Sequence, residues 1–531
     1  MIEREYKFDI PFDFHKEKFI DDIQDSIDGI KSVEFSGRKE YRDIYYDTRR
    51  YLLFLAGFSC RIRYSSKIRL EIKFEPKDTE NLYITRSEWI VSEKERKQTG
   101  KVRFEGKKVR KFFIENFQYN IPFPFFPFVI INSVREKYVI SYKRIKCELS
   151  FDYSKGSLVN SSSSKKHIKT FSFTEMEIEL LDSENSYEED FAELGKIIED
   201  KFSLKPVFIN KLKRVLKFFK CNPLKTDRYK ICFNDSPDAG LEKIVSYYFE
   251  IAMQNRAGCE IGIDSEYVHD MRVALRKIRT ALQCFRDYIG RREYLYLKNN
   301  CKWIAFFLGK VRDCDVYKVK VLNLLPEVRE KNSNYEMKYI LEELNRIREE
   351  NRRVMKLNFK SRRYKSFVLK FEGFCKNICG LKNHKEILLR DLFQETLSKI
   401  LKSLKKNIRR VRNAGLSADD IDIHRLRINF KKLRYTFEFF ADLLNENQRM
   451  VRQKLPDIQN ALGDYVDTFF ILDLTCLLEE RIGSNRYSRE ALILLKNILK
   501  SAQKHKDELK KNILSLLDGF VSSSEYISLQ K

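Results

Sequence analysis

Acidic side chains recur at every second position in two short stretches of the sequence. The stretches are Glu3-Arg4-Glu5-Tyr6-Lys7 and Glu175-Met176-Glu177-Ile178-Glu179. Successive side chains of a β-strand point to opposite faces, so each stretch places its acids on one face of a strand. Two such strands that meet would form an oxygen-rich site for a hard divalent cation. Either stretch alone also fits the solvated face of an ordinary strand.

Basic side chains alternate in the same way between the two acidic stretches. Arg61 and Arg63 share one strand face, and so do Arg135 and Lys137. An open sheet would expose these faces to solvent. A sheet closed into a barrel would turn them inward and pack its apolar faces against helices predicted at Phe14–Ile27 and Tyr187–Lys201. Such an interior suits a chain of phosphates with metal ions, because guanidinium groups clamp phosphate oxygens and carboxylates hold the metal.

The charged residues of the first 217 positions follow a recognisable order. They are Glu3-x-Glu5-x-Lys7, Tyr45-Tyr46-Asp47, Arg61-x-Arg63, Lys73, Arg86-x-Glu88, Asp152, the Glu175, Glu177 and Glu179 run, and Lys211. This ordered set resembles the CYTH family, the triphosphate tunnel metalloenzymes. The resemblance implies an eight-stranded antiparallel β tunnel with flanking helices. It also implies binding of a triphosphate with one or two Mg²⁺ or Mn²⁺ ions.

The resemblance assigns a role to each matching residue. Metal ligands would be Glu3, Glu5, Glu175, Glu177 and Glu179. Triphosphate contacts would be Lys7, Arg61, Arg63, Lys73, Arg86, Arg135, Lys137 and Lys211, and the catalytic set would be Glu5, Lys7, Arg61 and Arg63. Two positions depart from the family pattern: Arg135-x-Lys137 replaces Lys-x-Arg, and Glu71 replaces a small polar residue. We expect metal-dependent hydrolysis of tripolyphosphate to pyrophosphate and phosphate.

The chain after Leu241 changes to helical periodicity and repeats itself. One apolar seam comprises Val268, Met271, Leu275, Ile278, Leu282 and Phe285, beside a stripe of His269, Arg272, Arg276 and Arg279. The seam returns 155 residues later as Ile423, Leu426, Phe430, Leu433, Phe437 and Phe440, beside His424, Arg427, Lys431 and Arg434. Leu308-Gly309 with Asp313 similarly matches Leu462-Gly463 with Asp467, at an offset of 154. The duplication predicts two four-helix bundles related by a pseudo-twofold axis.

Each stripe places like charges four residues apart, as in Arg272 with Arg276 and Arg427 with Lys431. A solvated helix face usually mixes signs at this spacing, so the stripes favour an external anion. The two histidine-centred motifs and Leu308-Gly309-x-x-Arg312-Asp313-x-Asp315 resemble the CHAD domain, the conserved-histidine α-helical domain. This resemblance implies binding of inorganic polyphosphate and residence at polyphosphate granules. CYTH followed by CHAD is similar to the domain order of bacterial inorganic triphosphatases.

Composition agrees with a polyanionic partner. The formal net charge is +26, of which residues 1–220 contribute 43 bases and 36 acids and residues 221–531 the remaining +19. We expect a CYTH domain at 1–217, a linker at 218–240 and a CHAD domain at 241–525. The 11 cysteines show no paired spacing, which favours reduced thiols in the cytoplasm. No long apolar run or signal peptide precedes or interrupts the predicted elements, so we expect no membrane association.

Three alternatives remain open at the level of the sequence. The tunnel could be inactive and the protein a pure polyphosphate binder. A CYTH enzyme could instead act on thiamine triphosphate or another nucleoside or organic triphosphate. The basic half could bind nucleic acid, although its stripes lack the interleaved aromatic residues used for base stacking. The sequence does not specify an oligomeric state.

Overall fold

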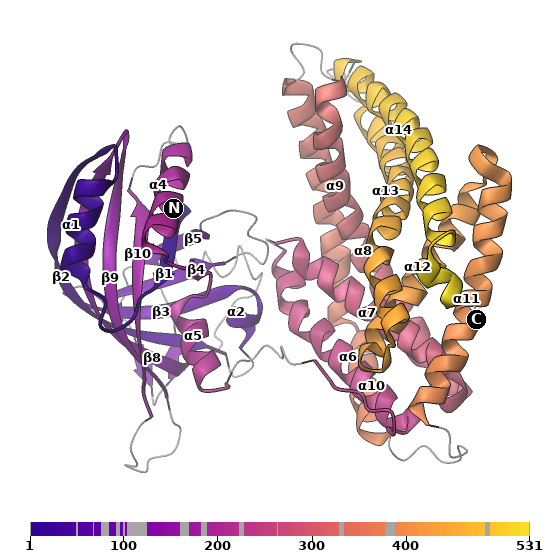
Figure 1. Cartoon of the computed structure of the whole chain (residues 1–531), viewed down its shortest axis with the longest axis horizontal. Helices are drawn as coiled ribbons and strands as arrows, with labels where there is room; N and C mark the ends of the chain where they lie inside the picture. Colours follow the sequence, from indigo (N-terminus) through magenta and orange to yellow (C-terminus); the bar gives the residue numbers. More distant parts are fainter. Residues whose placement is uncertain are drawn as a thin grey trace. The chain divides into compact units, whose positions relative to one another are not determined.

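The structure is a computed structural model of the chain (Figure 1). It describes residues 2–48, 51–66, 68–75, 84–91, 96–98, 101–103, 125–159, 169–181, 188–221, 228–262, 264–328, 334–378, 388–483 and 489–529. The chain divides into two compact units. The first comprises Met1–Lys225 and Ala257–Glu266, and the second comprises Thr226–Arg256 and Tyr267–Lys531.

The first unit is built on a curled antiparallel sheet. Its strands are β1 (Ile2–Asp9), β2 (Ile30–Asp47), β3 (Phe58–Tyr64), β4 (Ile68–Phe74), β5 (Ile84–Val91), β8 (Phe126–Tyr142), β9 (Ile145–Leu158) and β10 (Phe171–Leu180). They pair in the order β1-β10-β9-β8-β2-β3-β4-β5, and β1 also pairs with β5, so the pairing closes into a barrel. A separate ladder joins β6 (Arg96–Gln98) and β7 (Lys101–Arg103). The prediction of an antiparallel sheet that curls around a charged face is confirmed.

Helices α1 (Lys16–Ser26) and α4 (Glu188–Phe202) cover the apolar outer face of β1, β8, β9 and β10. Tyr6 and Phe8 of β1 are buried in this core together with Phe19 of α1 and Phe191 of α4. Gly195 allows the closest approach, because an added Cβ would lie 2.2 Å from the Tyr6 ring. Since Tyr6 and Phe8 face outward, Glu5 and Lys7, which alternate with them along β1, face the barrel interior.

Helix α5 (Lys211–Phe218) fixes one further cation against the barrel. Asn210 caps its start by accepting a hydrogen bond from the backbone N–H of Lys213. Leu212, Val215 and Leu216 of α5 are buried against Val129 and Ile131 of β8. This packing explains why Lys211, the first residue of the helix, is held at 6% exposure rather than in solvent.

Asp47, at the end of β2, organises the short helix α2 (Leu52–Leu55). Its buried carboxylate accepts hydrogen bonds from the backbone N–H groups of Leu53 at 3.0 Å and Phe54 at 2.8 Å. We therefore expect Asp47→Ala to lower the free energy of unfolding by about 1–2 kcal/mol, as loss of a helix cap does. Asp47→Asn should lose less, because the amide oxygen still accepts. Urea unfolding of both variants tests this, and equal stability of Asp47→Ala and the parent chain would contradict it.

The second unit is helical. Its helices are α6 (Pro237–Ile261), α7 (Glu266–Cys284), α8 (Arg291–Val328), α9 (Asn334–Lys360), α10 (Arg362–Asn377), α11 (Leu389–Ala414), α12 (Asp420–Phe439), α13 (Glu446–Gly483), α14 (Arg489–Val521) and α15 (Ser524–Ser528). The two predicted apolar seams on α7 and α12, each ending at the phenylalanine just beyond its helix, are buried throughout. The prediction of a helical second half is confirmed, whereas its arrangement as two bundles with pseudo-twofold symmetry stays a prediction.

Two further sequence expectations concern membranes and cysteines. Among the described residues, none of the helices combines the length and the apolar character needed to cross a bilayer. The ten cysteines within the described ranges are free thiols.

Candidate metal and phosphate sites

The strand register brings the two acidic stretches side by side. On the interior face, Glu5 lies opposite Glu179 and Lys7 opposite Glu177 across the β1–β10 ladder. Across the β10–β9 ladder, Glu175 lies opposite Asp152 and Glu179 opposite Glu148. The interior face of β10 is therefore flanked on both sides by further charged residues.

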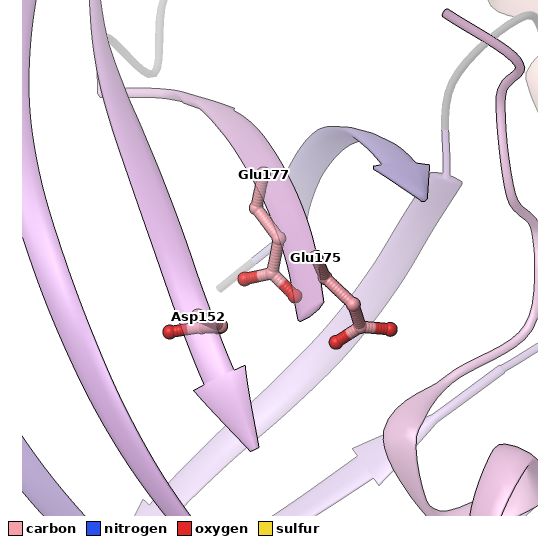
Figure 2. A group of neighbouring side chains, drawn as sticks. All are labelled: Asp152, Glu175 and Glu177. Atoms are coloured by element: carbon pink, nitrogen blue, oxygen red, sulfur yellow. The ribbon is translucent and has the colours of Figure 1, made fainter. Parts of the chain in front are cut away.

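Three of these carboxylates form a compact group. One oxygen from each of Asp152, Glu175 and Glu177 lies within 4.8 Å of the others, and all three side chains are buried (Figure 2). The Oε2 atom of Glu175 is buried and has no hydrogen-bond partner, since Lys211 Nζ, at 3.8 Å, is too far away to donate. A buried carboxylate oxygen without a donor is costly unless something positive binds it. The group therefore fits a hard divalent cation, which prefers carboxylate oxygens.

Basic side chains surround the same three acids. Lys7 Nζ lies 2.7 Å from Glu177 Oε1, and Arg135 Nε donates to Asp152 Oδ1 at 2.7 Å. Arg135 also donates to Glu177, and Lys211 to Asp152. Although burial opposes ionisation, Lys7, Arg135 and Lys211 lower the pKa of Glu177 well below its usual value. Burial likewise opposes ionisation of Asp152, yet Arg135 and Lys211 lower its pKa, so Asp152 and Glu177 are ionised, the form that binds a metal.

The predicted metal ligands are only partly brought together. Glu175 and Glu177 belong to the three-carboxylate group, whereas Glu5 and Glu179 lie beside it in register and are not members. Asp152 was not among the predicted ligands. Its period-two spacing from Glu148 and Ser150 was a signal, since it places Asp152 on the same face. The backbones of Glu3 and Arg86 pair between β1 and β5. Their side chains are not among those that the structure describes.

The predicted arginine pair is also inside the barrel, but two acids hold it. Arg63 donates from Nε and Nη2 to the two oxygens of Asp43, each at 2.8 Å. Arg61 donates from Nε to Glu71 Oε2 at 2.8 Å and from Nη1 to Asp43 Oδ2 at 3.1 Å. Burial opposes ionisation of Asp43, yet Arg61 and Arg63 lower its pKa to about 2. Sequence reasoning noted Glu71 but missed Asp43.

The remaining predicted phosphate contacts lie on the same interior surface. Lys137 Nζ contacts both oxygens of Glu148, at 2.7 and 2.8 Å. Lys73 is half-buried and lies two residues after Glu71 on β4. Burial raises the pKa of Glu71, but Arg61 and Arg63, with a smaller contribution from Lys73, lower it below its usual value. Lys211 lowers the pKa of both Asp43 and Glu177. This shared cation connects the arginine pair electrostatically to the three-carboxylate group.

In the second unit, the two basic stripes converge. Arg276 Nε on α7 donates to the Tyr435 hydroxyl on α12 at 2.8 Å. Arg272 contacts Asp313 at 3.3 Å, and its counterpart Arg427 lies 4.0 Å from Asp467. Arg434 donates to Gln459 at 2.9 Å, while Arg279 Nε is buried without a hydrogen-bond partner.

Two glycines repeat this geometry in the two halves. A Cβ added to Gly309 would lie 3.5 Å from the Arg272 guanidinium, and one added to Gly463 would lie 4.0 Å from that of Arg427. Each guanidinium thus lies close to the backbone of α8 or α13. The equivalent contacts support the internal duplication at the level of individual side chains.

The converged cations repel one another. Burial and the neighbouring Arg276 and Arg427 lower the pKa of Lys431 to about 6. Burial and Arg312, Arg276 and Arg272 lower the pKa of His269 to about 4, against an opposing effect of Asp270. Burial likewise lowers the pKa of His424, with help from Arg427 and Lys431. Both histidines are therefore neutral at pH 7, and the surface has an excess of positive charge that an anion would relieve.

The comparisons with known proteins bear mainly on the second unit. The CHAD domain family model matches residues 245–474. These residues form a CHAD domain. A search of curated protein sequences gave no match.

Several solved structures are similar to part of the chain. The CHAD domain from the plant Ricinus communis has 21% identity and a TM-score of 0.47, covering 56% of this chain and 96% of that one. PptA from Streptomyces chartreusis has 14% identity and a TM-score of 0.43, covering 54% and 99%. A Hippeastrum protein, proposed to be an adenylyl cyclase and described with a dominant triphosphatase activity, has 13% identity and a TM-score of 0.28, covering 41% and 96%.

Proposed function

We propose that the barrel hydrolyses tripolyphosphate to pyrophosphate and phosphate in a metal-dependent reaction, and that the CHAD domain binds long-chain polyphosphate. The observation that carries the first part is the buried group of Asp152, Glu175 and Glu177 facing Lys7, Arg135 and Lys211 within one closed barrel. Carboxylates for a metal and cations for phosphate are both present on one interior surface.

The charge balance of this surface argues for a metal. Its described cations include Lys7, Arg61, Arg63, Lys73, Arg135, Lys137, Lys211 and Arg214, and its acids include Glu5, Asp43, Glu71, Glu148, Asp152, Glu175, Glu177 and Glu179. Since the two sets nearly cancel, a triphosphate bound alone would leave several negative charges uncompensated. A divalent cation bound with it would restore the balance.

Asp152, Glu175 and Glu177 would hold Mg²⁺ or Mn²⁺, and a bound ion would neutralise phosphate charge and polarise the phosphoryl group. Neutralising these acids would free Lys7, Arg135 and Lys211 for phosphate oxygens. Arg61 and Arg63 would stabilise the charge on the transferred and leaving groups. Water attacks the terminal phosphorus, the bond to the pyrophosphate oxygen breaks, and the proton of water passes to a carboxylate such as Glu5, which lies 3.6 Å from Lys7.

Glu71 competes with substrate for the arginine pair in this scheme. It lies 2.6 Å from Arg61 and 3.7 Å from Arg63, where a phosphate oxygen would bind. We expect Glu71→Gln to lower KM for tripolyphosphate about tenfold, the effect of one charge-assisted contact, with kcat changing little. Steady-state phosphate release measures both constants. An unchanged or higher KM would show that Glu71 does not compete with substrate.

A pure polyphosphate-binding protein is the second candidate. Asp43 and Glu71 already satisfy both guanidinium groups, which favours a barrel that does not engage triphosphate. A phosphate-release assay separates the two candidate functions. Its substrates are tripolyphosphate, thiamine triphosphate, ATP and long-chain polyphosphate, each with Mg²⁺, Mn²⁺ or chelator. Release from tripolyphosphate that depends on metal supports hydrolysis, whereas no release from any substrate supports the second candidate.

The role of the CHAD domain rests on the converged cations of α7 and α12. His269, Arg272, Arg276, Arg279, His424, Arg427, Lys431 and Arg434 are the residues proposed to contact polyphosphate. Binding there would recruit the protein to polyphosphate granules in the cytoplasm. Competition between long-chain polyphosphate and duplex DNA for the intact protein tests the partner, because salt sensitivity alone accompanies any polyanion. Ready displacement of polyphosphate by DNA would favour a nucleic-acid partner.

A further inference from the structure

A cavity of about 380 Å³ lies between α7, α11 and α12, within the helical unit. Gln283, Cys284 and Asp287 line it from the end of α7 and the following 3-10 turn, η2 (Arg286–Tyr288). Lys399 and Ile400 line it from α11. None of these residues belongs to the two basic stripes.

The internal duplication shows what the matching place in the other half contains. Positions of α7 and its turn recur 155 residues later, so Gln283, Cys284 and Asp287 correspond to Glu438, Phe439 and Asp442. The buried positions of α6 recur in α11 152 residues later, as in Leu241 with Phe393, Val245 with Leu397 and Ala252 with Leu404. By this register, Lys399 and Ile400 correspond to Tyr247 and Tyr248.

In the other half, a piece of the chain itself occupies the matching place. The non-helical segment 228–231 runs across Glu438, Phe439 and Asp442. The Tyr229 hydroxyl donates to the Phe439 carbonyl oxygen at 3.4 Å, and the Ile231 backbone N–H donates to Asp442 Oδ2 at 3.1 Å. Arg228 donates to the Glu438 carbonyl oxygen.

The ring of Tyr229 completes this contact. It lies 5.4 Å from the Tyr247 ring and 6.4 Å from the Tyr248 ring, in edge-to-face arrangements. The filled site is therefore defined by a carboxylate that accepts a backbone N–H and by two α6 side chains that contact an aromatic ring.

Among the described residues, the half formed by α7 and α11 has smaller side chains at this place than the filled half. Cys284 stands where the filled site has Phe439, and Ile400 where it has Tyr248. The bond that Tyr248 donates to Glu438 at 2.8 Å has no equivalent, because Ile400 carries no hydroxyl. The carboxylate is kept, since Asp287 matches Asp442 and is exposed beside the cavity.

We propose that this cavity binds an extended peptide segment of a partner protein that carries an aromatic side chain. The aromatic ring would contact Ile400 and the Lys399 ammonium, and the backbone N–H two residues further on would donate to Asp287. The occupied site has this same spacing, from Tyr229 to Ile231. A peptide is favoured over a small molecule because the matching place holds backbone as well as side chain.

Binding of a fluorescent peptide with the sequence of residues 228–233, carrying Cys232→Ser, to the full chain tests the proposal by anisotropy. We expect saturable binding that weakens at least about tenfold when Asp287→Ala removes the acceptor, the effect of a hydrogen bond to a charged group. Gln283→Trp, at an exposed lining position, should block the cavity and weaken binding similarly. Tyr229→Ala in the peptide should do the same.

Asp442→Ala is the matched control, because it alters only the site that the chain fills itself. It should leave peptide affinity within about twofold of the parent value. Three results would overturn the proposal: no saturable binding, binding insensitive to both Asp287→Ala and Gln283→Trp, or binding lost only with Asp442→Ala. The last would mean that the peptide displaces segment 228–231 instead.

Discussion

Replacing Glu175 with glutamine is expected to reduce kcat for tripolyphosphate at least about 100-fold, because even outer-shell changes at metal sites cost 10- to 100-fold. Glu175 Oε1 accepts from Arg214 Nη1 at 2.8 Å, and an amide oxygen would preserve that bond. The buried Oε2 atom accepts no hydrogen bond, although Lys211 Nζ lies 3.8 Å from it. The variant therefore removes a charged metal ligand while keeping the oxygen that Arg214 contacts, and its melting temperature shows whether the fold is retained.

Metal affinity gives a readout that does not depend on turnover. We expect Mn²⁺ binding, measured by calorimetry, to weaken at least about tenfold in Glu175→Gln. Glu136→Gln is the matched control, since Glu136 lies on β8 next to Arg135 but pairs with Lys16 of α1 on the outer face. It should leave metal affinity and kcat unchanged. Full activity and unchanged Mn²⁺ affinity in Glu175→Gln would refute the metal site.

Glu177→Gln is a poorer test of the same idea. Glu177 neutralises Lys7 and Arg135, so its loss would remove one carboxylate partner from each of two buried cations. Breaking a buried ion pair in this way typically costs about 3–5 kcal/mol. Lost activity in that variant would not separate a catalytic role from a folding defect.

The acidic alternation of β1 and β10 was readable from the sequence because side-chain direction in a strand has a period of two. The partner of each acid was not readable, because it depends on the register between strands. The register of β9 places Asp152 beside Glu175, whereas the register of β1 places Glu5 beside Glu179. The sequence therefore predicted acids on β1 and β10, whereas the three-carboxylate group joins β10 with Asp152 of β9, and the role of each acid stays a prediction.

Asp43 shows the same limit on the basic side. It is one acid in the 18-residue strand β2, and its local sequence gives no sign of a special role. Only the β2–β3 ladder, which sets Asp43 opposite Arg63 and Tyr45 opposite Arg61, brings it to both arginines. Arg61 and Arg63 thus pair with carboxylates inside the barrel, and their predicted contact with phosphate stays a prediction.

The helical half was more predictable, because a duplication can be read from residue numbers alone. The equivalent pairs Arg272–Asp313 and Arg427–Asp467 follow from the offsets of 155 and 154. Their electrostatics did not follow, because the pKa of Lys431 depends on how closely α7 and α12 approach. Cross-helix effects from Arg276 and Arg272 reach Lys431 only in the folded unit.

With polyphosphate bound as proposed, we expect this lowered pKa to make the affinity depend on pH. Lys431 faces Arg276, Arg427, Arg272 and Asp467, and burial with the three arginines lowers its pKa to about 6, so the free protein holds it neutral at pH 8. A bound polyanion would favour the ammonium form, so binding would take up as much as one proton. Affinity should then fall by up to about tenfold per pH unit between pH 7 and 9.

The substitution Lys431→Arg separates this proton uptake from other pH effects. A guanidinium stays charged throughout the range, so the variant should bind polyphosphate more tightly than the parent at pH 8, with a nearly flat profile. Lys432→Arg is the matched control on the same helix and should retain the parent slope. The measurement is the dissociation constant for long-chain polyphosphate from pH 6.5 to 9 at fixed ionic strength, because salt alone changes affinity for polyanions. A parent profile that is flat, or a Lys431→Arg profile as steep as the parent's, would show that Lys431 lies outside the binding surface.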